Sequence, residues 1–366
     1  MYWLFLFKIC AAVKNGGSSP RSQIISEIHA NKPEQYVVEL IRAVSDHKLI
    51  IESSDECNIL VPAIMRNMHL VVEKLLDIKA DPNKVDTCNM PSETGEHEVI
   101  SSVPLIIAAY GSTARMVQLL LNAGADPNPQ NVRESSLVSS IRSNTEFTQK
   151  VLMLIQARAD VNAKCEDGFS TNHVVDAYGN WQRTVVDRSA GAEADVTTPL
   201  MTAVIRARSH PVARSVFMSL LSANADVNFL DKHGRGALWL SMSNITLFHL
   251  LRRRGALVTD AMKTEVNEVN TESGLTPLME AIASADVSRV DVLISARANI
   301  NAETANGVTP LMMALARNNH IFRILVLNGA RITPELRTRA VQLNDLNSFT
   351  WAEDEARDMS IRHQLG

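Results

Sequence analysis

A short sequence tag returns along this chain at regular steps, and this periodicity limits the possible folds more than any other feature. The tag reads Ala-Asp-Pro-Asn or Ala-Asp-Val-Asn and begins at Ala80, Ala125, Ala159 and Ala225. Looser versions follow at Ala256, Ala298 and Ala330. Three steps between tags are close to 33 residues, two are longer by about ten, and one is about double. A fixed period with insertions predicts a chain of stacked supersecondary units.

Each unit opens with signals for the start of a helix. Thr198, Thr276 and Thr309 are each followed by Pro-Leu, and Val103-Pro104-Leu105 is a relaxed version. A threonine hydroxyl suits the N-cap because it accepts a hydrogen bond from an unpaired backbone N–H, and proline suits the first helical position because it has no N–H to leave unpaired. A short helix, a break and a second helix with apolar residues at helical spacing follow in each unit.

The second helix of each unit ends at a residue that the sequence predicts to be left-handed. Glycine is the usual residue at such a position because it has no Cβ to clash, and asparagine also adopts this conformation. A charged residue there costs up to about 1 kcal/mol. The predicted left-handed residues are Gly124, Gly255 and Gly329, Asn224, and Lys79, Arg158 and Arg297.

Composition agrees with a folded helical protein. Hydrophobic residues make up 46% of the chain and aromatic residues only 5%, which favours helices packed through small and aliphatic side chains. The net charge of -4 exerts no broad attraction on phosphate backbones, so we expect no nucleic-acid partner. The four cysteines are far apart, which is typical of reduced thiols in an intracellular protein, and we predict a cytoplasmic location.

The N-terminal segment leaves two interpretations open. Its apolar run at residues 2–13 is interrupted by Lys8, is too short to span a bilayer and lacks a preceding basic region. One interpretation is a leader over residues 1–21 that is disordered or forms a packed helix. The other is a signal or an interfacial anchor, which would make the protein membrane-associated.

A helix–turn–helix period of this length, opening with Thr-Pro-Leu and closing with Gly-Ala-Asp-Val-Asn, resembles the ankyrin-repeat family. The resemblance implies an all-α solenoid of about seven helix-turn-helix units with β-hairpin fingers and extended finger insertions. We place a degenerate N-terminal cap repeat at residues 22–57, the array at 58–332, and a C-terminal capping helix with a charged tail at 333–366. The family's usual histidine after Thr-Pro-Leu is replaced by Met201, Met279 and Met312, so a thioether contact is expected instead of a polar tether.

The long steps place insertions near residues 84–102, 164–196 and 259–273, between a tag and the next helix start. Insertions there leave the stacking of helices intact, because the cost of closing a loop grows slowly with its length. Residues 164–196 are about one repeat long, so a degenerate repeat is an alternative to an insertion at this place. The sequence does not decide between them.

No catalytic motif stands out. The chain has no phosphate-binding glycine loop, no nucleophile elbow and no paired metal-binding histidines, so we predict that it is not an enzyme and has no cofactor and no metal site. The recurring Asp81, Asp126, Asp160 and Asp226 fit turn and cap hydrogen bonds better than a metal site. The alternative is a hydrolase-like active site built from the insertions, with His173, Asp176 and Asp187 close together.

The resemblance implies a scaffold or adaptor that binds one or more proteins through a concave face and the finger tips. We expect a monomer that does not bind membranes. Exposed apolar residues in a row mark such a contact surface, and Tyr110, Ile205, Leu240 and Met313 are expected to form one. The full set of predicted contact residues comprises Ile107, Tyr110, Thr202, Ile205, Arg206, Leu240, Ser243, Glu280, Ser284, Met313 and Arg317 on first helices, and Asp231, Lys232 and His233 at a finger tip.

Overall fold

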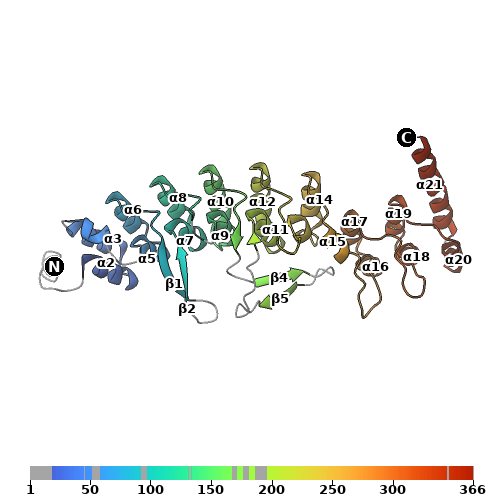
Figure 1. The fold of residues 1–366 in the computed structure, drawn as a ribbon, viewed down its shortest axis with the longest axis horizontal. Coiled ribbons are helices and arrows are strands. Elements are labelled where there is room, and N and C mark those ends of the chain that lie inside the picture. The colour runs from blue at the N-terminus through green and yellow to red at the C-terminus, as the bar shows by residue number, and fades with distance from the viewer. Residues whose placement is uncertain are drawn as a thin grey trace. The chain divides into compact units, whose positions relative to one another are not determined.

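The computed structural model of this chain is mostly helical, and its helices follow one another in pairs (Figure 1). It describes residues 19–365, apart from 45, 52–57, 92–96, 131, 133, 167–170, 176–180, 186–195 and 344–345. The predicted leader at residues 1–21 therefore lies almost entirely outside the described residues. The chain divides into two compact units, residues 1–168 with 196–226 (unit 1) and residues 169–195 with 227–366 (unit 2).

Both units consist of short helix pairs. In unit 1 they are α2 (Pro20–His29) with α3 (Glu34–Ala43), followed by α4 (Lys48–Ile51); α5 (Leu60–Met65) with α6 (His69–Asp77); α7 (Pro104–Gly111) with α8 (Ala114–Asn122); α9 (Ser136–Arg142) with α10 (Phe147–Gln156); and α11 (Pro199–Ser209) with α12 (Ala213–Ser222). In unit 2 they are α13 (Ala237–Leu240) with α14 (Ile245–Arg253), followed by α15 (Asp260–Glu265); α16 (Pro277–Ala283) with α17 (Val287–Ser295); α18 (Pro310–Leu315) with α19 (Asn319–Leu327); and α20 (Pro334–Gln342) with α21 (Leu346–Leu365).

The predicted helix starts are confirmed. The hydroxyls of Thr198, Thr276 and Thr309 each accept a hydrogen bond from the backbone N–H three residues later, and proline follows at the first helical position. Val103 has no capping side chain, so α7 starts with its proline alone. Helix ends agree as well, because each predicted left-handed residue has a positive φ, from 62° at Asn224 to 89° at Gly329.

Equivalent helices stack on each other within each unit. In unit 1, α5, α7, α9 and α11 pack side by side in chain order, and α6, α8, α10 and α12 do the same (Figure 1). Their apolar faces meet between the two rows, where Leu105, Val117 and Leu154 are fully buried. No single pair hides its apolar side alone, so each depends on its neighbours for a core.

The tag residues connect neighbouring repeats. Asn128 donates through Nδ2 to the Arg158 carbonyl at 2.9 Å and accepts through Oδ1 from the Asp160 N–H at 2.6 Å. The same pair of bonds joins Asn83 to the repeat that follows it. In unit 2, Asn228 and Asn267 each make this pair of bonds too. The side chain amide thus satisfies one carbonyl and one N–H that a helix end leaves unpaired.

The aspartates of the tag hold its turn. Asp81, Asp126 and Asp160 each accept a hydrogen bond through Oδ1 from the N–H two residues later, at 2.8 to 2.9 Å. This confirms the prediction of turn hydrogen bonds for these three residues. In place of the family's histidine tether, Met201 and Met279 are buried side chains with exposures of 3% and 1%.

The junctions between successive repeats differ from the expected β-hairpin fingers. Strands are found in the insertions: β1 (Asp86–Pro91) pairs antiparallel with β2 (His97–Ser102), β3 (Cys165–Glu166) with β6 (Val196–Thr197), and β4 (Thr171–Val175) with β5 (Trp181–Val185). The described residues of the 164–196 segment contain no helix. At the short junction 301–309, one backbone bond from Thr304 N–H to the Val308 carbonyl closes a tight turn instead, because too few residues remain for a ladder.

The insertion near residues 259–273 was predicted as a lengthened finger, but it begins with helix α15. Thr259 caps this helix, and its hydroxyl accepts from the Met262 N–H at 3.2 Å. The chain then reaches Asn267, whose side chain makes the tag contacts to the next repeat. The insertion therefore lies inside the tag, between Ala256 and Asn267.

Candidate functional site

The seventh position after the helix start forms a row across unit 1. Seven residues after the first residue of each repeat, this position is Met65 on α5, Tyr110 on α7, Arg142 on α9 and Ile205 on α11. The first residues of these repeats are Asn58, Val103, Ser135 and Thr198. Because these helices stack in order, equivalent positions lie next to one another. We call Met65, Tyr110, Arg142, Ile205 and the adjacent Arg206 the first-helix row.

The first-helix row exposes apolar surface. Tyr110 is 55% exposed and Met65 is 53% exposed, although every residue of α7 from Pro104 to Ala109 is buried. Ile205 is half-buried. Tyr110 and Ile205 were predicted contact residues, whereas Met65 was missed because its unit opens at Asn58 without a Thr-Pro-Leu motif. Counting seven residues from Asn58 would have found it.

Three predicted surface residues are buried, and for them the prediction of exposure was wrong. Ile107 is 6% exposed because α7 is covered on both sides by α5 and α9. Thr202 is 7% exposed, and its hydroxyl donates to the Thr198 carbonyl at 3.0 Å. Leu240 is 7% exposed because α13 is a single helical turn that packs all its residues into the core. The expected row of exposed apolar residues therefore does not include Leu240.

The predicted first-helix residues of unit 2 are mainly polar and engaged. Glu280 is half-buried and accepts through Oε1 from Asn270 at 2.9 Å and Ser273 at 3.1 Å. Arg317 is exposed and donates to the Ala283 carbonyl at 2.7 Å. Ser243 and Ser284 are exposed, and Met313 is half-buried.

The predicted finger tip is a tight turn held by Asp231. Its carboxylate accepts from the backbone N–H groups of His233 and Arg235 at 2.8 Å and pairs with the Arg235 guanidinium at 2.8 Å. Lys232 and His233 are exposed at the tip. Asp231 therefore shapes the turn, while its two neighbours point charge and polarity toward solvent.

Charge on the first-helix row comes from two arginines. Arg142 pairs with Glu134 at 3.5 Å, whereas the Arg206 guanidinium lies 4.5 Å from the ring centroid of Phe147. Burial lowers the pKa of Arg206. Among the described residues, the buried Nε of Arg206 has no hydrogen-bond partner.

A fully buried lysine lies behind the row. The Lys150 ammonium on α10 donates to the Ala109 carbonyl at 3.1 Å, to Ser143 Oγ at 2.7 Å and to Thr145 Oγ1 at 3.1 Å. Burial lowers its pKa to about 8, and the nearby Glu146 carboxylate opposes this shift. Ala109 lies in the last turn of α7, and Ser143 and Thr145 follow α9, so Lys150 connects two neighbouring repeats.

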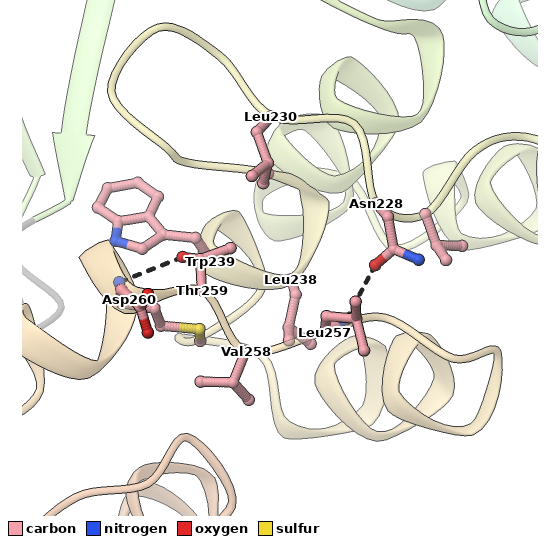
Figure 2. A pocket seen from close by; sticks show the side chains of 11 residues that line it. Asn228, Leu230, Leu238, Trp239, Leu257, Val258, Thr259 and Asp260 are labelled. Atoms are coloured by element: carbon pink, nitrogen blue, oxygen red, sulfur yellow. Dashed lines mark hydrogen bonds between the residues drawn. The ribbon is translucent and has the colours of Figure 1, made fainter.

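Unit 2 contains a pocket of about 330 Å³ beside the inserted helix α15 (Figure 2). Trp239 lies on one side of it, and Asn228 is bonded to the backbone of Leu257 on the other (Figure 2). The lining consists of Val227, Asn228, Leu230, Gly236, Leu238, Trp239, Leu257, Val258, Thr259, Asp260 and Met262. The indole N–H of Trp239 donates to Glu265, which ties α13 to α15. This mainly apolar hollow is large enough for one side chain of a binding partner.

Neither a metal site nor a membrane-spanning helix is found in the part of the chain that is described. No three His, Cys, Asp or Glu residues are arranged there to hold a metal ion. His173 lies in β4 opposite Arg183, but Asp176 and Asp187 lie outside the described residues, so the predicted catalytic grouping is not placed. In the same part of the chain, no helix combines the length and hydrophobicity needed to cross a bilayer.

Comparison with known proteins agrees with the repeat geometry. The family described as Ankyrin repeats (3 copies) matches residues 247–335, and the family described as Ankyrin repeat matches residues 102–132. The chain is also 30% identical over 156 residues to the Neurogenic locus notch homolog protein 2 of Homo sapiens and to that of Mus musculus. That alignment covers 40% of this chain and only 6% of each relative. Its paired, stacked helices and the tag at each junction agree with these matches, so the chain contains ankyrin repeats within residues 102–132 and 247–335.

Proposed function

We propose that this protein is a non-enzymatic scaffold or adaptor that binds partner proteins through the first-helix row of unit 1. The observation that supports this most directly is the exposure of Tyr110 and Met65 on adjacent stacked helices. Large exposed side chains on neighbouring elements are typical of contact surfaces, and tyrosine is enriched at their energetic centres. Ankyrin repeats most often serve protein binding, which supports the same role.

We further propose that residues 58–332 form an array of about seven units, closed by residues 22–57 and 333–366 at its ends. Helix pairs α2/α3 and α20/α21 flank the array and support this division. Terminal units of such arrays need a polar outer side, because no neighbour covers them. In this arrangement the turn with Lys232 and His233 would offer additional contacts beside the first helices.

The test is a comparison of two double variants that remove similar apolar groups from opposite sides of unit 1. The first is Tyr110→Ala with Ile205→Ala on first helices. The second is Leu70→Ala with Leu152→Ala, two exposed residues on second helices. Tagged proteins are expressed in cells, and captured partners are quantified by mass spectrometry. We expect the first variant to lose at least one partner that the second retains, with the helical circular dichroism signal unchanged in both.

Equal capture by both variants and the unaltered protein would contradict the proposal. A partner lost only with the Leu70 and Leu152 changes would instead place the binding surface on the second helices.

A further inference from the structure

The first helices of unit 1 end in a surface that is richer in positive charge than the protein as a whole. The last turns of these helices and the residues just after them carry five basic residues, Lys32, Arg66, Arg142, Arg206 and Arg208, against one acidic residue, Glu27. The whole chain, in contrast, has a net charge of -4. Cations are favoured near helix C-termini by the helix dipole, and Arg66 illustrates this by donating to the His29 carbonyl at 3.3 Å.

Three acidic groups beside this surface, Glu34, Glu146 and Glu134, already make hydrogen bonds or ion pairs within the fold. Glu34 accepts from the Leu70 N–H at 2.9 Å, and Glu146 accepts from the Ala114 N–H at 2.7 Å. Both carboxylates therefore compensate unpaired N–H groups at the start of second helices. Glu134 accepts from Ser139 at 2.8 Å and pairs with Arg142. The negative charge of these three carboxylates is therefore already compensated by groups of the protein itself.

Arg206 differs from Arg66 because no helix carbonyl accounts for its position. Its guanidinium lies over the Phe147 ring and its Nε is buried, so its two terminal nitrogens are the atoms that can meet a planar acceptor. Arginine binds a carboxylate through two parallel hydrogen bonds in this orientation. Ile205 and the exposed Tyr110 supply apolar surface on the same row.

In unit 2, helices α13, α16 and α18 lack this combination. The positions equivalent to Tyr110 and Ile205 are Ser243, Ala283 and Ala316, which are small. The one arginine on that row, Arg317, is bonded to a helix carbonyl as Arg66 is. Charge and apolar area therefore coincide on the first helices of unit 1 and not on α13, α16 and α18, whereas the terminal helix α20 carries exposed Arg337, Arg339 and Val341.

We propose that the first-helix row of unit 1 binds an acidic peptide segment of a partner protein, one that presents carboxylates to Arg206 and apolar side chains to Met65, Tyr110 and Ile205. This inference rests on the proposed protein-binding function and specifies the chemistry of the partner. Charge complementarity fixes the choice, because a basic or neutral segment would leave the Arg206 guanidinium desolvated without a counter-charge.

The experiment selects peptides from a random display library on the full-length protein and measures the affinity of enriched sequences by fluorescence anisotropy. We expect enriched peptides to combine several glutamates or aspartates with leucine or aromatic residues. Their affinity should fall about tenfold or more with Arg206→Glu and with Tyr110→Ala. The matched charge control is Arg115→Glu on α8, an exposed arginine of the same unit, for which a change of less than about twofold is expected. Circular dichroism verifies that each variant is folded.

The outcomes separate this inference from the proposed function. Enriched peptides that are neutral or basic but depend on Tyr110 would overturn the acidic partner and leave the binding surface standing. Acidic peptides that bind Arg206→Glu as tightly as the unaltered protein would also overturn it. Peptides insensitive to Tyr110→Ala and Arg206→Glu, or no enrichment, would contradict both. A single-stranded DNA oligonucleotide that binds through Arg206 more tightly than the best peptide would show that the first-helix row binds phosphate groups instead of carboxylates.

Discussion

At the scale of single residues, Lys150 shows how a stacked core accommodates a buried charge. Its ammonium has three acceptors, so none of its protons is left without a partner. Even so, removing it from water disfavours the charged form, and its pKa is lowered from 10.5 to about 8. The sequence alone does not reveal this residue, because a lysine within a helix ordinarily indicates an exposed face.

This shift predicts how stability depends on pH. Between pH 8 and 10.5 the unfolded chain retains the Lys150 proton while the folded chain has released it, so the free energy of unfolding rises with pH in this window. Below pH 8 both states are protonated and the contribution is constant. Between pH 7 and pH 10, the free energy of unfolding of the unaltered protein should rise by roughly 2 kcal/mol relative to that of Lys150→Met.

Urea unfolding of both proteins at several pH values measures this difference and cancels the titration of groups common to both. A difference between the two proteins that stays constant across this range would show that the Lys150 pKa is not lowered.

Residue positions also explain which part of the candidate site was predictable. Tyr110 was predicted because the repeat pattern numbers its helix from a recognisable start. Ile107, Thr202 and Leu240 were wrongly placed on the surface: α5 and α9 cover Ile107, Thr202 bonds to its own helix, and Leu240 lies on a single turn that is buried throughout. The periodicity identifies equivalent positions but does not state how deeply each is covered.

At the scale of helices and turns, the left-handed helix ends were predictable because their steric demand is local. Gly124 has φ +85°, and a Cβ built there meets no atom within 4 Å. Arg158 occupies the equivalent place with φ 65°. Any difference between glycine and another residue at these positions therefore reflects the backbone conformation rather than packing.

We accordingly expect opposite effects from two substitutions at equivalent helix ends. Gly124→Ala should lower the free energy of unfolding by about 1 kcal/mol, and Arg158→Gly should raise it by about 0.5 to 1 kcal/mol. Thermal and urea unfolding measure both. If the two substitutions shifted stability in the same direction, the conformational explanation would fail.

The junctions between helix pairs were less predictable. The resemblance to the family suggested hairpin fingers, whereas the 301–309 junction forms a tight turn and strands occur only in the insertions within the described chain. Helix α15 was missed because Thr259-Asp260 is a helix start without the Pro-Leu that marks other units. Turn and insertion conformations depend on a few contacts rather than on periodicity.

At the scale of the whole molecule, each unit is held together by contacts between neighbouring repeats. Asn128 makes such contacts through its side-chain amide, and Lys150 makes them through a buried ammonium that donates hydrogen bonds. The asparagine of the tag was recognised only as part of the repeating signature, and its role in joining repeats emerged from the structure. Because these contacts lie between repeats, the ends of the first helices remain exposed at Met65 and Tyr110, the surface that we propose for partner binding.

The central claim is that the first-helix row of unit 1 touches the partner, and site-specific photo-crosslinking tests it most directly. A photoreactive phenylalanine analogue is placed at position 110 or, as a control, at position 152 on α10, where Leu152 is 42% exposed. After irradiation in cells, crosslinked products are identified by mass spectrometry. We predict a crosslinked partner protein from position 110 and none from position 152. The same partner crosslinked from position 152 with none from position 110 would contradict the account.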